Sequence, residues 1–149
     1  MAQAEAVGPL DESVGYGLKR AAAALRTTMD AALRSLDLTV PQYACLELIA
    51  RHPGLSNADL ARGAFVTRQS MNLVLRGLQD RDLVARPATA PRGRALPSRL
   101  TPAGEELLAA ASAAVRAVEL RMLAPFSAAE QERLLHDLAT CVRALAPDA

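Results

Sequence analysis

Residues 55–101 read LSNADLARGAFVTRQSMNLVLRGLQDRDLVARPATAPRGRALPSRLT and decide the fold of this 149-residue chain. They predict two short helices joined by a tight turn, then a strand, an arginine-rich loop and a second strand. That order is the outline of a winged helix-turn-helix. Residues 51–104 hold nine arginines against three acids, whereas the rest of the chain holds eight basic residues against thirteen acidic ones. A basic module of this shape suits a polyanion, and duplex DNA is the polyanion we expect.

Capping residues and a turn define the predicted helix pair. Ser56-Asn57-Ala58-Asp59 begins a helix that ends at Gly63, and Thr67 begins a second helix that runs to about Arg81. The second helix turns Met71, Val74, Leu75 and Leu78 inward. Arginine suits guanine in the major groove, while asparagine and glutamine suit adenine. The predicted DNA-binding residues of this recognition helix are Thr67, Arg68, Gln69, Ser70, Asn72 and Arg76.

The arginine-rich loop that follows predicts a protruding hairpin, or wing. Residues 83–86 and 96–100 are its expected strands, since the loop between them has two prolines and no apolar periodicity. Pro97 cannot donate to a ladder, so it fits only a sheet edge or a bulge. Arg92 and Arg94 at the tip suit the minor groove, whose negative potential attracts arginine. Both are predicted DNA-binding residues.

Helices are also predicted on both sides of this unit. Apolar residues recur three or four apart between about residues 11 and 36, with Ser13 or Asp11 as the expected cap. Thr39 and Gln42 have the spacing of a capping box for a buried helix to about Arg51. The remaining two expected helices run from Thr101-Pro102 to about Leu123, and from a Ser127–Glu130 capping box onward.

The first and last helices have apolar faces broader than a small DNA-binding unit needs. We therefore expect them to pack against a second copy of the chain, so that the homodimer presents two recognition helices to a palindromic site. Residues 1–38 and 102–149 are the predicted dimerisation helices, and 39–101 the winged helix-turn-helix. The fold class expected is mainly α with a small β-hairpin wing.

Other functional classes are disfavoured by composition. Aromatic residues make up 3% of the chain, too few for stacking single-stranded nucleic acid. No apolar run reaches membrane-spanning length and no signal peptide is evident, so we expect a cytoplasmic protein with no membrane partner. Cys45 and Cys141 are expected as buried thiols in a core or an interface. With His52 and His136 they make no convincing metal site, and no cofactor-binding or catalytic motif accompanies them, so we expect no enzyme.

With these residues identified, the chain resembles the MarR (multiple antibiotic resistance regulator) family of bacterial transcription regulators over nearly its whole length. The most specific matches are LTVPQYACLELIARHPGLSNADLA at 38–61, VTRQSMNLVLRGLQDRDLVAR at 66–86 and RGRALPSRLTPAGEELL at 92–108. The resemblance implies a triangular homodimer, dimerised by both chain ends, that binds its operator through recognition helix and wing. It also implies a small phenolic or other aromatic inducer between the two regions.

Two positions depart from the family pattern. Arg94 resembles the family's wing arginine, but Arg92 stands where the family usually has an acidic residue, which removes a salt bridge and makes the wing tip more positive. Asp82 stands where a glycine often follows the recognition helix, and aspartate tolerates a left-handed turn. Tyr16 and Tyr43 each offer a ring and a hydroxyl to an aromatic ligand, although ordinary core packing is the better account of either residue.

Two alternatives remain open from the sequence. A dimeric winged helix can recognise protein rather than DNA, and a regulator of the same fold can sense oxidants through a thiol. Salt-dependent DNA binding separates the first alternative from a transcriptional repressor, and a response to peroxide identifies the second.

Overall fold

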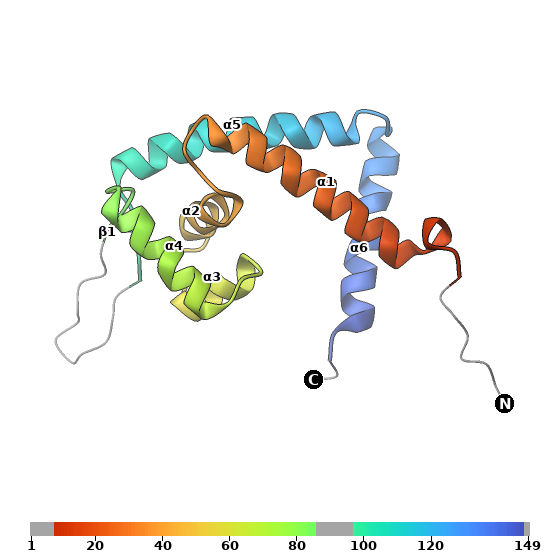
Figure 1. The fold of residues 1–149 in the computed structure, drawn as a ribbon, viewed down its shortest axis with the longest axis horizontal. Coiled ribbons are helices and arrows are strands. Elements are labelled where there is room, and N and C mark those ends of the chain that lie inside the picture. The colour runs from red at the N-terminus through yellow and green to blue at the C-terminus, as the bar shows by residue number, and fades with distance from the viewer. Residues whose placement is uncertain (1–7, 86–96, 148–149) are drawn as a thin grey trace.

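The structure is a computed structural model that describes residues 8–85 and 97–147 (Figure 1). Helices dominate it, and one short antiparallel hairpin completes it, which confirms the predicted fold class. In chain order, the elements are a 3-10 helix at Leu10–Glu12, α1 at Val14–Arg34, α2 at Val40–Arg51, α3 at Asn57–Gly63, α4 at Arg68–Asp80, β1 at Val84–Ala85, β2 at Arg99–Leu100, α5 at Pro102–Leu123 and α6 at Ala128–Leu145.

Side-chain caps set the beginnings of the helices, as the sequence predicted. Capping boxes are formed at the predicted Thr39, Ser56 and Ser127, each satisfying backbone N–H groups that the first helical turn leaves unpaired. The expected first helix is too long at both ends. Asp11 lies in the separate 3-10 turn, and Ser13 is the cap, its Oγ accepting a 3.3 Å hydrogen bond from Tyr16 N.

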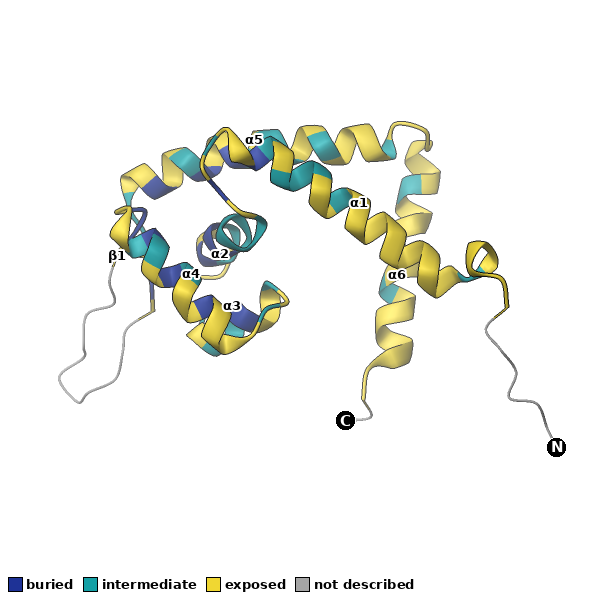
Figure 2. Cartoon of the chain, in the orientation of Figure 1, coloured by how far each residue is buried: buried dark blue, intermediate teal, exposed yellow. Residues whose placement is uncertain are grey.

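The main core lies where α2, α3 and α4 meet the first half of α5 (Figure 2). α4 supplies Met71, Leu75 and Leu78 to this core as predicted, while Val74 is only partly buried. Leu33 and Leu38, at the end of α1 and just beyond it, are also buried, although neither belongs to the expected apolar stripe of the first helix. The largest fully buried side chains are Leu33, Leu46, Leu60, Met71, Leu78, Val84 and Cys45.

Within the described residues the strands are shorter than the sequence predicted, since Leu83, Pro97 and Ser98 lie outside the ladder. Val84 pairs with Leu100 and Ala85 with Arg99. Pro97 precedes the ladder, which agrees with its lack of an N–H donor, and Ser98 is buried beside it. The predicted strand ends at Arg86 and Leu96 lie outside the described residues.

A tight joint connects β1 to α5. Thr101, the cap of α5, donates from Oγ1 to Asp82 O at 2.6 Å and from its backbone N to Leu83 O at 3.1 Å. A Cβ added at Gly104 would overlap the Leu83 carbonyl oxygen. Only glycine at position 104 allows the backbone of α5 to approach the backbone of Leu83 this closely. The close approach and the two Thr101 hydrogen bonds fix α5 against the hairpin.

Three long helices extend away from the core. α1 packs against α5, and α6 leaves the end of α5 across the direction of that helix (Figure 1). At the α5–α6 connection, Gln131 Nε2 donates to Leu123 O and Phe126 O at 3.2 and 3.1 Å. α6 has no buried residue. Its apolar side chains, all exposed in this single chain, are Leu134, Leu135, Leu138, Val142 and Leu145.

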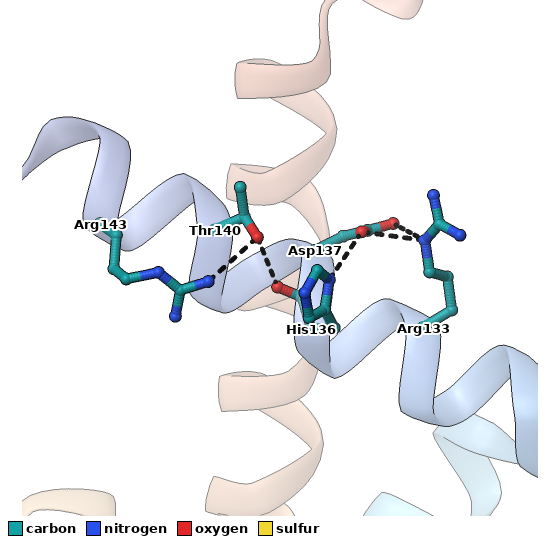
Figure 3. A network of polar contacts seen from close by, with 5 residues as sticks. All are labelled: Arg133, His136, Asp137, Thr140 and Arg143. Carbon is teal, nitrogen blue, oxygen red and sulfur yellow. Dashed lines mark hydrogen bonds and ion pairs between the residues drawn. The ribbon is translucent and has the colours of Figure 1, made fainter.

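The polar face of α6 is internally bonded (Figure 3). Arg133 Nε donates to both carboxylate oxygens of Asp137 at 3.1 and 3.2 Å, and His136 Nδ1 lies 3.4 Å from Asp137 Oδ1. Thr140 Oγ1 donates to the His136 carbonyl oxygen and accepts from Arg143. These exposed pairs contribute little to stability. The polar side of α6 is therefore satisfied within the helix, while its apolar side is left exposed in the single chain.

Candidate nucleic-acid interface

α4 divides sharply into a buried side and an exposed polar side. Thr67 caps the helix by accepting a 3.0 Å hydrogen bond from Ser70 N. The buried positions Met71, Leu75 and Leu78 repeat every three or four residues and anchor one side in the core. The rest of the helix surface faces solvent. Every member of the predicted set is exposed, with Thr67, Arg68 and Ser70 at the start of the helix and Gln69, Asn72 and Arg76 around its polar side.

A contact from α3 orients one of these side chains. Asn57 Nδ2 donates a 3.2 Å hydrogen bond to Asn72 Oδ1, which joins the first turn of α3 to the middle of α4. Asn57 itself follows the Ser56 cap. Its role could not be read from the sequence, because nothing in the local pattern brings two residues 15 positions apart together. The bond leaves the Asn72 amide N–H groups directed away from Asn57, where they can donate to another acceptor.

The turn between α3 and α4 has an unusual conformation. Phe65 lies in the left-handed region, with φ 59°, and its ring is 94% exposed. Hydrogen bonds from Phe65 N to Arg62 O and from Val66 N to Ala61 O close the turn. The turn sets the angle at which α4 leaves α3, as the helix-turn-helix motif requires.

The far end of α4 is tied to the connection between α1 and α2. Arg81, the C-cap of α4, donates from Nη1 to Asp37 O at 2.6 Å. Asp82 follows with φ 59°, the left-handed conformation that the sequence predicted at this departure from the family pattern. The end of the recognition helix is thus bonded to the connection between α1 and α2, which lies outside the helix-turn-helix.

The wing is only partly described. β1 and β2 form its base, and Arg99 is exposed there. Arg92 and Arg94, the two predicted tip residues, lie outside the described residues. Their assignment to the minor groove remains a prediction.

A groove of about 1090 Å³ lies beside this base, between α2, β2 and the first half of α5. Its lining includes apolar side chains, two carboxylates and one guanidinium, namely Ile49, Leu100, Leu108, Glu47, Glu105 and Arg99. Glu47 is held by an ion pair with Arg51 and accepts a 3.2 Å hydrogen bond from Ser112 Oγ. The groove therefore combines apolar side chains with one fixed carboxylate, that of Glu47, and it could hold a small molecule.

Neither tyrosine predicted for a ligand site lines this groove. Tyr43 lies next to it on α2, where burial is the main cause that raises the pKa of its phenol and where it interacts with Ser112 and Glu47, two lining residues. Tyr16 lies far from it in sequence, on the exposed first half of α1. The role of both residues in ligand binding stays a prediction.

The two cysteines differ in environment. Cys45 is fully buried, as expected, and burial raises the pKa of its thiol to about 12. Cys141 is exposed in the single chain, so the expectation of burial is wrong for this residue within one protomer. It lies on α6 among the exposed apolar residues, on a helix with no buried residue in the described chain.

Metal-binding and membrane-spanning features are both missing from the described ranges. No cluster of three or more histidine, cysteine or acidic side chains with metal-binding geometry occurs in residues 8–85 and 97–147. Nor does any helix there combine the length and apolarity that crossing a bilayer requires.

Comparison with known proteins identifies the family. A model of the MarR family matches residues 36–95. The HTH-type transcriptional repressor Rv2887 of Mycobacterium tuberculosis is 47% identical to this chain over 131 residues, which cover 86% of this chain and 94% of the relative.

Solved structures of Rv2887 have the same fold. Its complex with salicylic acid matches with a TM-score of 0.74 and 46% identity, covering 88% of this chain and 97% of that one. Its complex with DNA matches with a TM-score of 0.73 and 44% identity, covering 88% and 98% of the two chains. On this identity, coverage and shared architecture, the chain belongs to the MarR family.

Proposed function

We propose that this chain is a ligand-responsive transcriptional repressor that acts in the cytoplasm and binds a palindromic DNA operator as a homodimer. The exposed polar side of α4 carries the proposal. Arginine, glutamine and asparagine on an exposed helix can reach base edges in the major groove, which is wide enough to admit an α-helix. The complex of Rv2887 with DNA supports the assignment, since that repressor is 44% identical to this chain.

Within this interface we propose that different residues contact the bases and the phosphates. Gln69, Asn72 and Arg76 contact base edges, while Thr67, Arg68 and Ser70 at the helix start contact the phosphates that flank them. The hydrogen bond from Asn57 holds the Asn72 amide in one orientation before DNA arrives, which lowers the ordering cost of binding. Arg92 and Arg94 contact the minor groove next to the recognition helix.

The homodimer is proposed from the apolar surface that one chain leaves uncovered. Val14, Leu135, Val142 and Leu145 are each more than two-thirds exposed, and they lie at the two ends of the chain. An exposed surface of this kind is a usual sign of a partner. We assign residues 1–38 and 102–149 to dimerisation and residues 39–101 to DNA binding.

A small aromatic ligand would regulate binding by shifting the spacing of the two recognition helices. The complex of Rv2887 with salicylic acid supports a ligand of this class. We place it in the groove between α2, β2 and α5, with Tyr43 at the margin. Because Arg81 bonds Asp37 in the connection between α1 and α2, a ligand that favours another position of α2 and this connection also favours another position of α4.

The alternative of a thiol-based sensor has less support from this site. A sensing cysteine needs a stabilised thiolate and access to oxidant, whereas Cys45 is buried with its pKa raised to about 12. Cys141 is exposed, but the proposed dimer covers the helix that carries it. A purely protein-binding winged helix would not need the exposed amide and guanidinium groups of α4.

The deciding experiment selects duplexes from a random library with the full-length protein and then measures affinity over a range of salt concentrations. We expect a palindromic consensus and an affinity that falls steeply with salt. Arg94→Ala should weaken binding to all duplexes and lower the salt slope by about 0.9 for each phosphate that the variant no longer neutralises. Arg133→Ala, whose side chain is 79% exposed on α6, serves as the charge-matched control and should leave the slope unchanged.

Salicylate added to the same assay should release the DNA and leave the dimer intact. Binding that shows no sequence preference and no salt dependence would exclude a sequence-specific regulator. DNA release by peroxide but not by salicylate would favour the thiol-based alternative.

A further inference from the structure

Leu73 is an exposed leucine on the recognition helix. Its side chain is 63% exposed, whereas Leu75 and Leu78 on the same helix are only 3% and 0% exposed. A single exposed leucine on a protein surface is ordinary. Its position on α4 is what sets this one apart.

Helix geometry places Leu73 within the polar side of α4. At 3.6 residues per turn, it lies about 40° around the helix from Gln69 and about 60° from Arg76, but about 160° from the buried Met71. It is therefore flanked by two of the side chains proposed to reach bases. When α4 enters the major groove, Leu73 enters with them.

Leucine can recognise only one of the groups that the major groove displays. It has no donor or acceptor, so it cannot bind a phosphate or the polar edge of a base. The C5-methyl group of thymine is the apolar group on the base edges in that groove, and apolar side chains read it by contact. A leucine left 63% exposed in the free protein can lose water against such a methyl group.

We propose that Leu73 is a specificity-determining residue that reads the C5-methyl group of one thymine in each half-site of the operator. This inference rests on the proposed DNA-binding function. It adds an apolar contact to an interface otherwise made of amides, hydroxyls and guanidinium groups. The operator half-site then has a required thymine, and not merely an A·T pair, at the position Leu73 faces.

The test uses the best duplex that the wild-type protein selects from a random library. Each thymine is replaced in turn by deoxyuridine, which lacks only the methyl group, and affinities are measured for the wild type and Leu73→Ala. We expect one thymine per half-site whose replacement weakens wild-type binding by about fourfold, the effect of one methyl-sized apolar contact. The same replacement should leave the affinity of Leu73→Ala unchanged.

Two further variants make the result specific. Leu73→Met keeps an apolar side chain of similar reach, so it should retain the preference for thymine over deoxyuridine. Gln69→Ala removes a polar neighbour and should weaken binding while leaving that preference intact. Because Leu73 is largely exposed, the thermal stability and dimer mass of Leu73→Ala should match the wild type.

Each outcome decides a different claim. If wild-type protein binds the duplex but deoxyuridine weakens the wild type and Leu73→Ala equally, the contact with the methyl group is wrong and DNA binding stands. A uniform loss of affinity by Leu73→Ala on all duplexes, substituted or not, also overturns it. If the wild type selects no duplex, both the DNA-binding proposal and this inference fail.

Discussion

Replacing Gly104 by alanine should weaken the joint between the hairpin and α5. An added methyl carbon would overlap Leu83 O, and it would lie 3.0 Å from the carbonyl carbon and 3.4 Å from Cα of the same residue. All three atoms belong to the backbone, so no side-chain rotation relieves the overlap. α5 has to move away from β1.

The size of the effect follows from what that movement breaks. Thr101 donates to Asp82 O at 2.6 Å and to Leu83 O at 3.1 Å, and a shift of α5 lengthens both bonds. Losing them costs about 1 kcal/mol each, and overpacking adds about 1–3 kcal/mol. A loss of about 3–5 kcal/mol in the free energy of unfolding corresponds to a fall of roughly 6–20 °C in Tm for a chain of this length.

Gly77→Ala is the matched control, because it makes the same chemical change inside α4. A Cβ at Gly77 would meet only Gln42 Nε2, at 3.9 Å. Alanine is the better helix former, so this variant should gain about 0.5–1 kcal/mol. Thermal and urea unfolding should be measured at one protomer concentration, since a dimer's Tm depends on it. A Gly104→Ala protein as stable as Gly77→Ala would refute the close approach of the two backbones.

Three further predictions concern the free protein. Hydrogen bonds from Ser56 are the main cause that lowers the pKa of Asp59 below its usual 3.8. The ionised carboxylate therefore adds stability that is complete above pH 3.8 and is lost as the pH falls through the lowered pKa. Asp59→Ala should therefore lower Tm at pH 7, and a gap that persists unchanged in strong acid would contradict this. Phe65→Asn should raise stability by about 1 kcal/mol, because asparagine tolerates φ 59° better and the ring it replaces is 94% exposed; a lower Tm would count against backbone strain. In a Cys141→Ser background, Cys45 should react with iodoacetamide only as the protein unfolds, since its thiol is buried with a pKa of about 12; rapid labelling of folded protein would show otherwise.

Much of the fold could be predicted because its signals are local. A capping box joins residues three apart, and an amphipathic helix repeats every three or four, so Ser56, Thr67 and Ser127 mark helix starts without knowledge of the rest of the chain. The strands were less predictable. Their length depends on pairing across the hairpin, and only two residue pairs form a ladder in the described part.

The candidate site was predictable in its polar residues and not in its supporting contacts. The polar set on α4 could be named from helical periodicity, and all of it is exposed. Leu73 was missed because the sequence interpretation looked for polar residues on the side of α4 opposite Met71 and Leu75, although helical spacing also places Leu73 there. Its exposed fraction of 63%, against 3% for Leu75, agrees with that position.

The sequence by itself determined the capped starts of most helices, the polar side of α4, the apolar excess of the terminal helices and the resemblance to the MarR family. Each of these features depends on residues a few positions apart or on a stretch of sequence that matches the family pattern. Only the tertiary structure decided which distant residues meet. Asn57 donates a hydrogen bond to Asn72, 15 positions away, and Arg81 donates one to Asp37, 44 positions away. Gly104 lets the backbone of Leu83 approach α5 closely. Such contacts depend on how whole helices pack, which no local pattern encodes, so the orientation of the recognition helix is a property of the folded chain.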